Sequence, residues 1–174
     1  MGIGNVATVT ACLAALVCSG ALADAQTTIN EGLFALSLPG EWKGGYDRKS
    51  DSWHYRSASG REAVTVGVRR RTGGRGAESM KDDFRAYLET RRKAERGLGG
   101  PALRLGKPQV QERPTAILAR YSAFEPGRKR RTLTRVIVNE VAAGSFYYEA
   151  TGYAAAAFDA RAKVVLGTVG LIGE

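Results

Sequence analysis

Few residues in this 174-residue sequence have the types that catalysis or metal binding requires. His54 is the only histidine, and the two cysteines, Cys12 and Cys18, lie near the N-terminus. A catalytic serine–histidine pair needs an exposed, activated serine, and no Gly-x-Ser-x-Gly motif surrounds any serine. A zinc ion needs three or four histidine, cysteine or carboxylate ligands. We therefore expect no metal and no cofactor, and we keep a hydrolytic enzyme centred on His54 as an alternative.

Two pairs of carboxylates could bind a cation, but both have simpler explanations. Asp47 and Asp51 share a loop with basic neighbours that disfavour a cation, and Asp82 with Asp83 would stabilise the positive end of a helix. Neither pair has the spacing of an EF-hand. The glycine-rich segment 71–76 precedes this helix but does not match the phosphate-binding motifs, so a flexible connector is expected there.

The feature that remains is the placement of positive charge. Lys and Arg exceed Asp and Glu by 26 to 17, which gives a net charge of +9. Two clusters contain no acidic residue: Arg69, Arg70, Arg71 and Arg75, and then Arg128, Lys129, Arg130 and Arg131. The second follows Pro126-Gly127, which predicts a type II turn at an exposed hairpin tip. Both clusters are candidate partner-binding sites, or else solvated loops that discourage aggregation at strand edges.

Residues 1–23 have the features of a cleavable export signal. They contain no charged residue, and an apolar run over 11–17 leads to Ala21-Leu22-Ala23, the small-x-small pattern of signal peptidase sites. Cleavage would leave one domain, residues 24–174, in the periplasm or secreted, with no transmembrane span and neither cysteine. An uncleaved anchor, or lipid attachment at Cys18, is the alternative.

Location and charge together narrow the expected partners. An exported basic domain meets acidic proteins or an anionic envelope surface, such as lipid head groups, more often than nucleic acid. The sequence therefore predicts a non-enzymatic envelope protein that binds an acidic partner through its basic loops, and no nucleic acid is expected.

These residues must be positioned by strands and two helices. Alternating apolar residues predict strands over residues 33–38, 53–57, 64–68, 102–110, 115–124, 132–141 and 145–153. Helical spacing predicts helices over 79–96, capped by Ser79 and Gly97, and over 154–168. The segment around Gly44 and Gly45 is expected to be an exposed loop. Short links between the later strands favour an antiparallel meander, so the fold class is α+β, with two helices that cover both faces or share one.

The order of these segments resembles the PsbP-like superfamily. The resemblance rests on 34–42 (FALSLPGEW), the strand 64–68 (VTVGV), the helix from Ser79, and 146–151 (FYYEAT) followed by a helix containing Phe158. It implies an α/β/α sandwich around an antiparallel sheet, a fold that includes the photosystem extrinsic protein, small bacterial lipoproteins and type VI secretion accessory or immunity proteins. The resemblance implies a binding or assembly role, and a periplasmic immunity protein that neutralises a secreted toxin is a further alternative.

Overall fold

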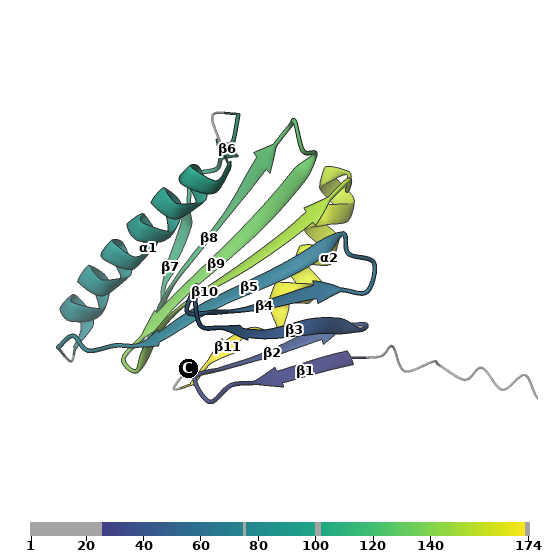
Figure 1. Ribbon diagram of the computed structural model, residues 1–174. Helices are drawn as coiled ribbons and strands as arrows, with labels where there is room; N and C mark the ends of the chain where they lie inside the picture. The colour runs from purple at the N-terminus through teal and green to yellow at the C-terminus, as the bar shows by residue number, and fades with distance from the viewer. Residues whose placement is uncertain (1–25, 75, 100–101, 173–174) are drawn as a thin grey trace, which may run out of the picture.

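A computed structural model describes residues 26–74, 76–99 and 102–172 of the chain. Its centre is an eight-stranded antiparallel sheet in the order β3-β4-β5-β10-β9-β8-β6, with β7 also paired to β8 (Figure 1). The strands are β3 (Trp42–Asp47), β4 (Ser52–Ser57), β5 (Glu62–Arg70), β6 (Arg104–Leu105), β7 (Gln109–Glu112), β8 (Ala116–Glu125), β9 (Arg130–Asn139) and β10 (Ala142–Thr151). A smaller sheet contains β1 (Gln26–Asn30), β2 (Phe34–Pro39) and β11 (Gly170–Leu171).

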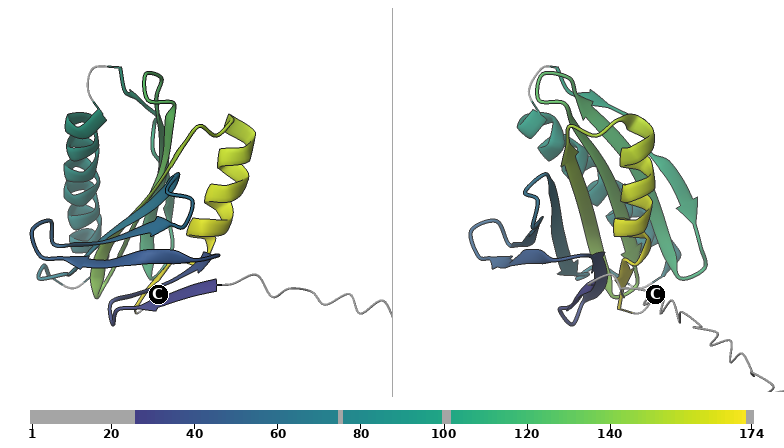
Figure 2. Two further views of the ribbon diagram at one scale, coloured as in Figure 1. Left: turned by 45° about the vertical axis from the view of Figure 1, so that its right-hand side comes forward. Right: turned by 90° about the vertical axis from the view of Figure 1, so that its right-hand side faces the viewer.

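The two helices lie on opposite faces of the large sheet, as the left view of Figure 2 shows. Helix α1 (Ala77–Gly99) packs on β8, β9 and β10 from one side, and α2 (Ala155–Gly167) packs on β2, β9 and β10 from the other. Neither helix has the length and apolar character that a membrane-spanning helix needs. The structure is an α/β/α sandwich of the α+β class, and of the two arrangements left open by the sequence, the helices cover both faces.

Period-two alternation explains why both faces of the sheet are buried. In β5, Val64, Val66 and Val68 point into the core beneath α2 and the small sheet. In β9, Val136 and Val138 point to the other side, where they pack with Met80 and Phe84 of α1. Strand segments covered on both faces carry apolar residues at successive positions, which is why Ala116–Ala119 in β8 and Val136–Val138 in β9 are continuous apolar runs.

Several local expectations were wrong. The segment around Gly44 and Gly45 is not a loop but part of the edge strand β3, and Gly44 has φ 153° with the His54 carbonyl where a side chain would be. Helix α1 starts at Ala77 and ends at Gly99, so Ser79 and Gly97 lie within it and do not cap it. The predicted strand 102–110 is divided into β6 and β7.

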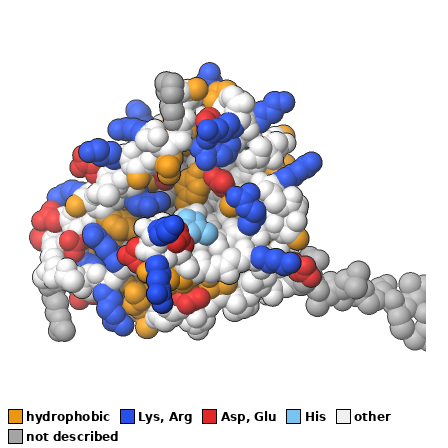
Figure 3. All heavy atoms as spheres, viewed as in Figure 1, with side chains coloured by type: hydrophobic (Ala, Val, Ile, Leu, Met, Phe, Trp, Pro, Cys, Tyr) orange, Lys and Arg blue, Asp and Glu red, His pale blue; other side chains and the backbone are white. Residues whose placement is uncertain are grey.

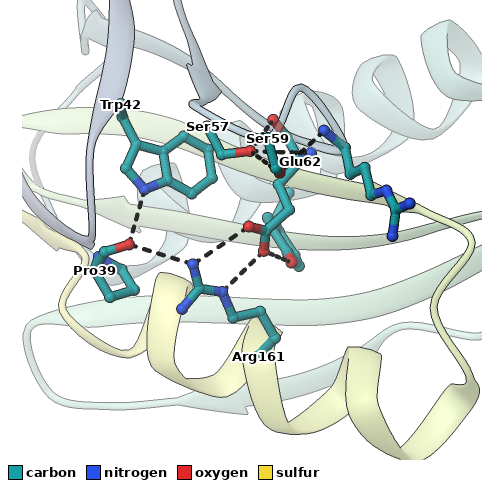
Figure 4. A network of polar contacts seen from close by, with 8 residues as sticks. Pro39, Trp42, Ser57, Ser59, Glu62 and Arg161 are labelled. Atoms are coloured by element: carbon teal, nitrogen blue, oxygen red, sulfur yellow. Dashed lines mark hydrogen bonds and ion pairs between the residues drawn. The ribbon is translucent and has the colours of Figure 1, made fainter.

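Helix α2 is fixed to the sheet by a buried carboxylate (Figure 4). Glu62 of β5 is 4% exposed and accepts hydrogen bonds from the Tyr148 hydroxyl (2.6 Å) and from Nε of Arg161 on α2 (2.9 Å). Arg161 also donates to the carbonyl of Pro39, which accepts a second hydrogen bond from the Trp42 indole. This network therefore connects α2, β5, β10 and the link from β2 to β3.

Replacing Arg161 with methionine is expected to lower the free energy of unfolding by about 2–4 kcal/mol, because it leaves a buried carboxylate without its cation. Urea unfolding followed by circular dichroism measures the change. Lys163→Met, on an exposed position of the same helix, is the control and should change stability little. Equal effects of the two substitutions would contradict the structural role of Arg161.

Helix α1 carries a second buried carboxylate. Glu95 is 5% exposed, and its Oε1 accepts hydrogen bonds from the hydroxyls of Thr134 (2.7 Å) and Tyr121 (2.8 Å) on the sheet. Burial raises the pKa of Glu95 above its ordinary value of 4.5, although both hydroxyls act in the opposite direction. The folded protein therefore binds this proton more tightly than the unfolded chain does.

The sign of this shift predicts a pH dependence. The contribution of Glu95 to the free energy of unfolding should fall as the pH rises from 4.5 through the raised pKa. A Glu95→Gln protein keeps an oxygen that can accept both hydroxyls, and its stability relative to the wild type should increase over this range and then level off. Urea unfolding between pH 4 and 8 measures the difference, with exposed Glu89→Gln as control. A difference that is constant over this range would contradict the shift.

Candidate functional site

The two predicted basic clusters lie at opposite ends of the large sheet. Arg69 and Arg70 end β5 at the lower end in Figure 1, whereas residues 126–129 form the turn between β8 and β9 at the upper end. The ten residues of β9 separate these ends by about 33 Å, at 3.3 Å per residue. Figure 3 also shows Lys and Arg side chains spread over the viewed face and not gathered in one patch. A small ligand cannot contact both clusters.

Within the first cluster, Arg71 is a structural residue. Its side chain is 3% exposed, and its Nε lies 2.7 Å from Oδ2 of Asp83. It also donates to the carbonyl of Asn139 and to the hydroxyl of Ser79, which fixes the start of α1 to the end of β9. The guanidinium of Arg71 is therefore occupied by internal partners.

The other arginines of this cluster differ from Arg71. Arg69 and Arg70 are exposed, and the guanidinium of Arg69 lies 5.2 Å from the centre of the Tyr87 ring. They line a cavity of about 230 Å³ together with Arg71 and Asp83. Arg75 lies outside the described residues, as does the predicted signal at 1–23.

The second cluster also contains both cations with internal partners and cations that face solvent. Arg130 is 17% exposed and forms ion pairs with Glu125 (2.8 Å) and Glu149 (3.1 Å). The guanidinium of Arg131 lies 4.4 Å from the centre of the Phe124 ring and donates to the carbonyl of Tyr153. Both arginines therefore hold the end of the hairpin together.

Arg128 and Lys129 point outward from the tip of this hairpin. Arg128 is 66% exposed and lies 3.5 Å from a Glu125 oxygen, and Lys129 is also exposed. The predicted type II turn is wrong, because Lys129 and not Gly127 has the left-handed conformation, with φ 48°. The Lys129 amide closes the turn by donating to the carbonyl of Pro126.

His54 is exposed on β4 and is surrounded by hydroxyl groups. Its Nε2 lies 2.9 Å from both Ser50 and Ser52 Oγ, and its Nδ1 lies 3.1 Å from Thr65 Oγ1. A triad needs a carboxylate on the far ring nitrogen, but Asp47 contacts the Ser50 hydroxyl instead. Within the described residues, His54 has no hydrogen-bonded carboxylate to orient it as a general base.

The carboxylates of the two candidate cation-binding pairs also bond to groups within their own loop or helix. The Lys49 amide and the Ser50 hydroxyl donate to Asp47 and lower its pKa, and Asp51 accepts a hydrogen bond from Tyr46. On α1, Asp82 pairs with Arg85. Among residues 26–74, 76–99 and 102–172, no three His, Cys, Asp or Glu side chains lie close enough together to hold a metal ion.

A third group of cations was missed by the sequence analysis. Four positively charged residues from different segments line one groove: Arg113 in the link from β7 to β8, Arg120 on β8, Arg135 on β9 and Lys163 on α2. Each is isolated in the sequence, and only folding brings them together. The available signal was that Arg120 and Arg135 each stand directly beside an apolar run, Ala116–Ala119 and Val136–Val138, since a charge next to buried positions needs an exposed position or a partner.

Comparison with known proteins identifies the fold. No protein-family model and no curated protein matches the chain. Among solved structures it is similar to cyanobacterial PsbP (CyanoP) from Synechocystis sp. PCC 6803, with 11% identity, a TM-score of 0.62, and coverage of 88% of this chain and 96% of that one. The chain therefore has the PsbP-like fold, which confirms the resemblance in the sequence.

Two further structures support this assignment. The yeast (Saccharomyces cerevisiae) Ran-binding protein Mog1p is 7% identical, with a TM-score of 0.50 and coverage of 86% of this chain and 96% of that one. A Bacteroides thetaiotaomicron protein is 14% identical, with a TM-score of 0.52 over 82% of this chain, and this chain spans only 46% of its length. None of the three descriptions names a catalytic activity.

The different surroundings of neighbouring arginines give a direct test of the structure. Arg71→Ala is expected to lower the free energy of unfolding by about 2–4 kcal/mol, because it leaves Asp83 and three further hydrogen-bond partners without their donor. Arg70→Ala, one residue earlier and exposed, should leave stability nearly unchanged. Thermal and urea unfolding compare the two, and similar stabilities of the two variants would contradict the assignment of Arg71 as structural.

Proposed function

We propose that this protein is a non-enzymatic binding protein that acts outside the cytoplasm and engages an acidic partner through its outward-facing cations. The observation that carries the proposal is the division within each basic cluster. Arg69 and Arg70 at one end, and Arg128 and Lys129 at the other, are exposed, while their neighbours are held inside by carboxylates and carbonyls. The exposed cations are therefore presented on a backbone that is already fixed.

Fixed cations bind an anionic surface more favourably than mobile ones. Binding costs conformational entropy at each side chain and loop that must be ordered, and Arg71, Arg130 and Arg131 remove that cost for the backbone. The net charge of +9 also attracts an acidic partner over a distance of about one Debye length, roughly 8 Å at physiological salt. These features support faster association and specificity for acidic surfaces.

The distance between the clusters favours a large partner. Contact with both ends of the sheet requires an acidic protein face or an anionic envelope surface, because a small anion reaches only one end. The surroundings of His54 support a binding role over hydrolysis, and the description of Mog1p as Ran-binding gives a precedent for protein binding by this fold.

The test uses protein that an expression host has exported to its periplasm. Mass spectrometry locates the N-terminus of the exported protein, which is expected at Asp24. Calorimetry measures its binding to poly-L-glutamate at rising salt, and sedimentation measures its binding to phosphatidylglycerol vesicles. Arg128→Ala/Lys129→Ala and Arg69→Ala/Arg70→Ala are each expected to weaken binding by roughly 2- to 30-fold and to reduce the salt dependence, because each removes two exposed charges.

The control variant, Arg48→Ala/Lys49→Ala, removes the same charge from the turn between β3 and β4. If it weakens binding as much as the cluster variants do, binding depends on net charge alone and the assigned cations do not form a binding site. Unchanged binding of both cluster variants would also overturn the proposal. Binding to polyglutamate but not to vesicles identifies the partner as protein, and co-expression with a candidate toxin then tests immunity.

A further inference from the structure

Helix α2 does not cover the whole of its face of the sheet. It packs on β2, β9 and β10, and the right view of Figure 2 shows green strands extending past it. The uncovered surface is a groove of about 390 Å³ between β7, β8 and the second half of α2. Its apolar lining includes Leu118, Leu133 and Leu166, which also belong to the core beneath the helix.

The charged side chains that the described residues place in this groove are all positive. Arg120 and Arg135 stand directly opposite each other on β8 and β9, a pairing of like charges that destabilises a sheet. Arg135 donates to the Leu166 carbonyl of α2, whereas Arg120 and Lys163 have no hydrogen-bond or ion-pair partner within the described part of the chain. Among the described residues, the Arg113 guanidinium has one hydrogen bond, which it donates to the side-chain oxygen of Gln111 at 3.4 Å. No acidic side chain of the described residues lines the groove, so its charge is complementary to an anion.

The groove is bordered by a strand with a free edge. All four residues of β7 are exposed, and β7 pairs with β8 alone among the described strands. The Arg113 amide donates to the Ala116 carbonyl, so Arg113, Gln111 and Gln109 direct their backbone groups toward β8. Because these directions alternate along an antiparallel strand, the amide and carbonyl groups of Val110 and Glu112 point outward.

We propose that an extended acidic segment of a partner protein adds to β7 as an antiparallel strand and places its carboxylates in this groove. Strand addition uses main-chain hydrogen bonds for affinity and alternate side chains for specificity. The antiparallel orientation continues the pattern of every strand pairing in this sheet. The inference shares an acidic partner with the proposed function but uses a different surface from the ends of the sheet.

The two faces of β7 specify the side chains of the added strand. Gln109 and Gln111 lie opposite Arg120 and Leu118 and share the groove face. Side chains of the partner on this face would lay their methylene groups over the leucines and reach the cations with their carboxylates. On the other face Val110 is 51% exposed, so an apolar residue of the partner would pack against it. The preferred segment therefore alternates acidic and apolar residues.

The probe is a capped seven-residue peptide of alternating glutamate and valine that begins and ends with glutamate. Binding to the intact protein is measured by calorimetry, and amide hydrogen exchange is followed by NMR. In antiparallel addition, the valine amides face β7 and the glutamate amides face away. N-methylation of the valines is therefore expected to abolish binding, whereas N-methylation of the glutamates should leave it nearly unchanged. The Val110 and Glu112 amides should become protected from exchange when the peptide binds.

Protein variants test the groove. Arg120→Ala/Lys163→Ala is expected to weaken peptide binding by about tenfold or more, while Arg48→Ala/Lys49→Ala, which removes the same charge from the exposed turn between β3 and β4, should change it less than about twofold. Equal loss in the two variants, equal binding of the two methylated peptides, or no binding of the peptide would each overturn the inference. If the cluster variants lose polyglutamate binding but the peptide tests fail, the proposed function stands and the groove inference does not. The two proposals can therefore fail separately.

Discussion

The carboxylate of Glu62 imposes a constraint on the whole structure, because a buried charge must have a cation nearby. Arg161 supplies that cation from α2, and the same guanidinium reaches the Pro39 carbonyl at the end of β2. The position of α2 over β9 and β10 and the placement of the small sheet beside it are therefore linked. This position also leaves β7 and β8 uncovered on that face, so the groove follows from the same contact that holds the helix.

Arginines with similar sequence neighbours have opposite roles in this protein. Arg71 and Arg130 are held inside by Asp83, Glu125 and Glu149, and they keep the ends of the strands in place. The residues beside them face solvent and carry the net charge outward. A guanidinium is suited to both roles, because its fixed fork of donors satisfies several buried acceptors and its charge stays on at any physiological pH.

Local pattern was enough to predict most elements of the fold but not their relations. Alternating valines defined β5, and the spacing of Met80 and Phe84 placed α1, because these signals depend on neighbours a few residues apart. The same information could not show that β3 is a strand, since its glycines resemble a loop and its pairing with His54 and Tyr55 is a tertiary contact. Nor could it show that the Arg71 side chain is buried while Arg70 is exposed, or that Arg120 and Lys163 line the same groove, because burial and proximity arise only when distant segments pack.

An exposed edge strand is a liability, because it can pair with another copy of itself. The short β7 carries no proline, yet it lies beside a groove whose charged side chains, among the described residues, are all cations. A second copy would bring its own Arg113 and Arg120 against the first, and this repulsion disfavours self-association. An acidic strand would meet no such barrier and would bring carboxylates to Arg120 and Lys163, which have no ion-pair partner within the described residues. The charges that disfavour self-association at this edge are thus the same charges that would select an acidic strand in the proposed complex.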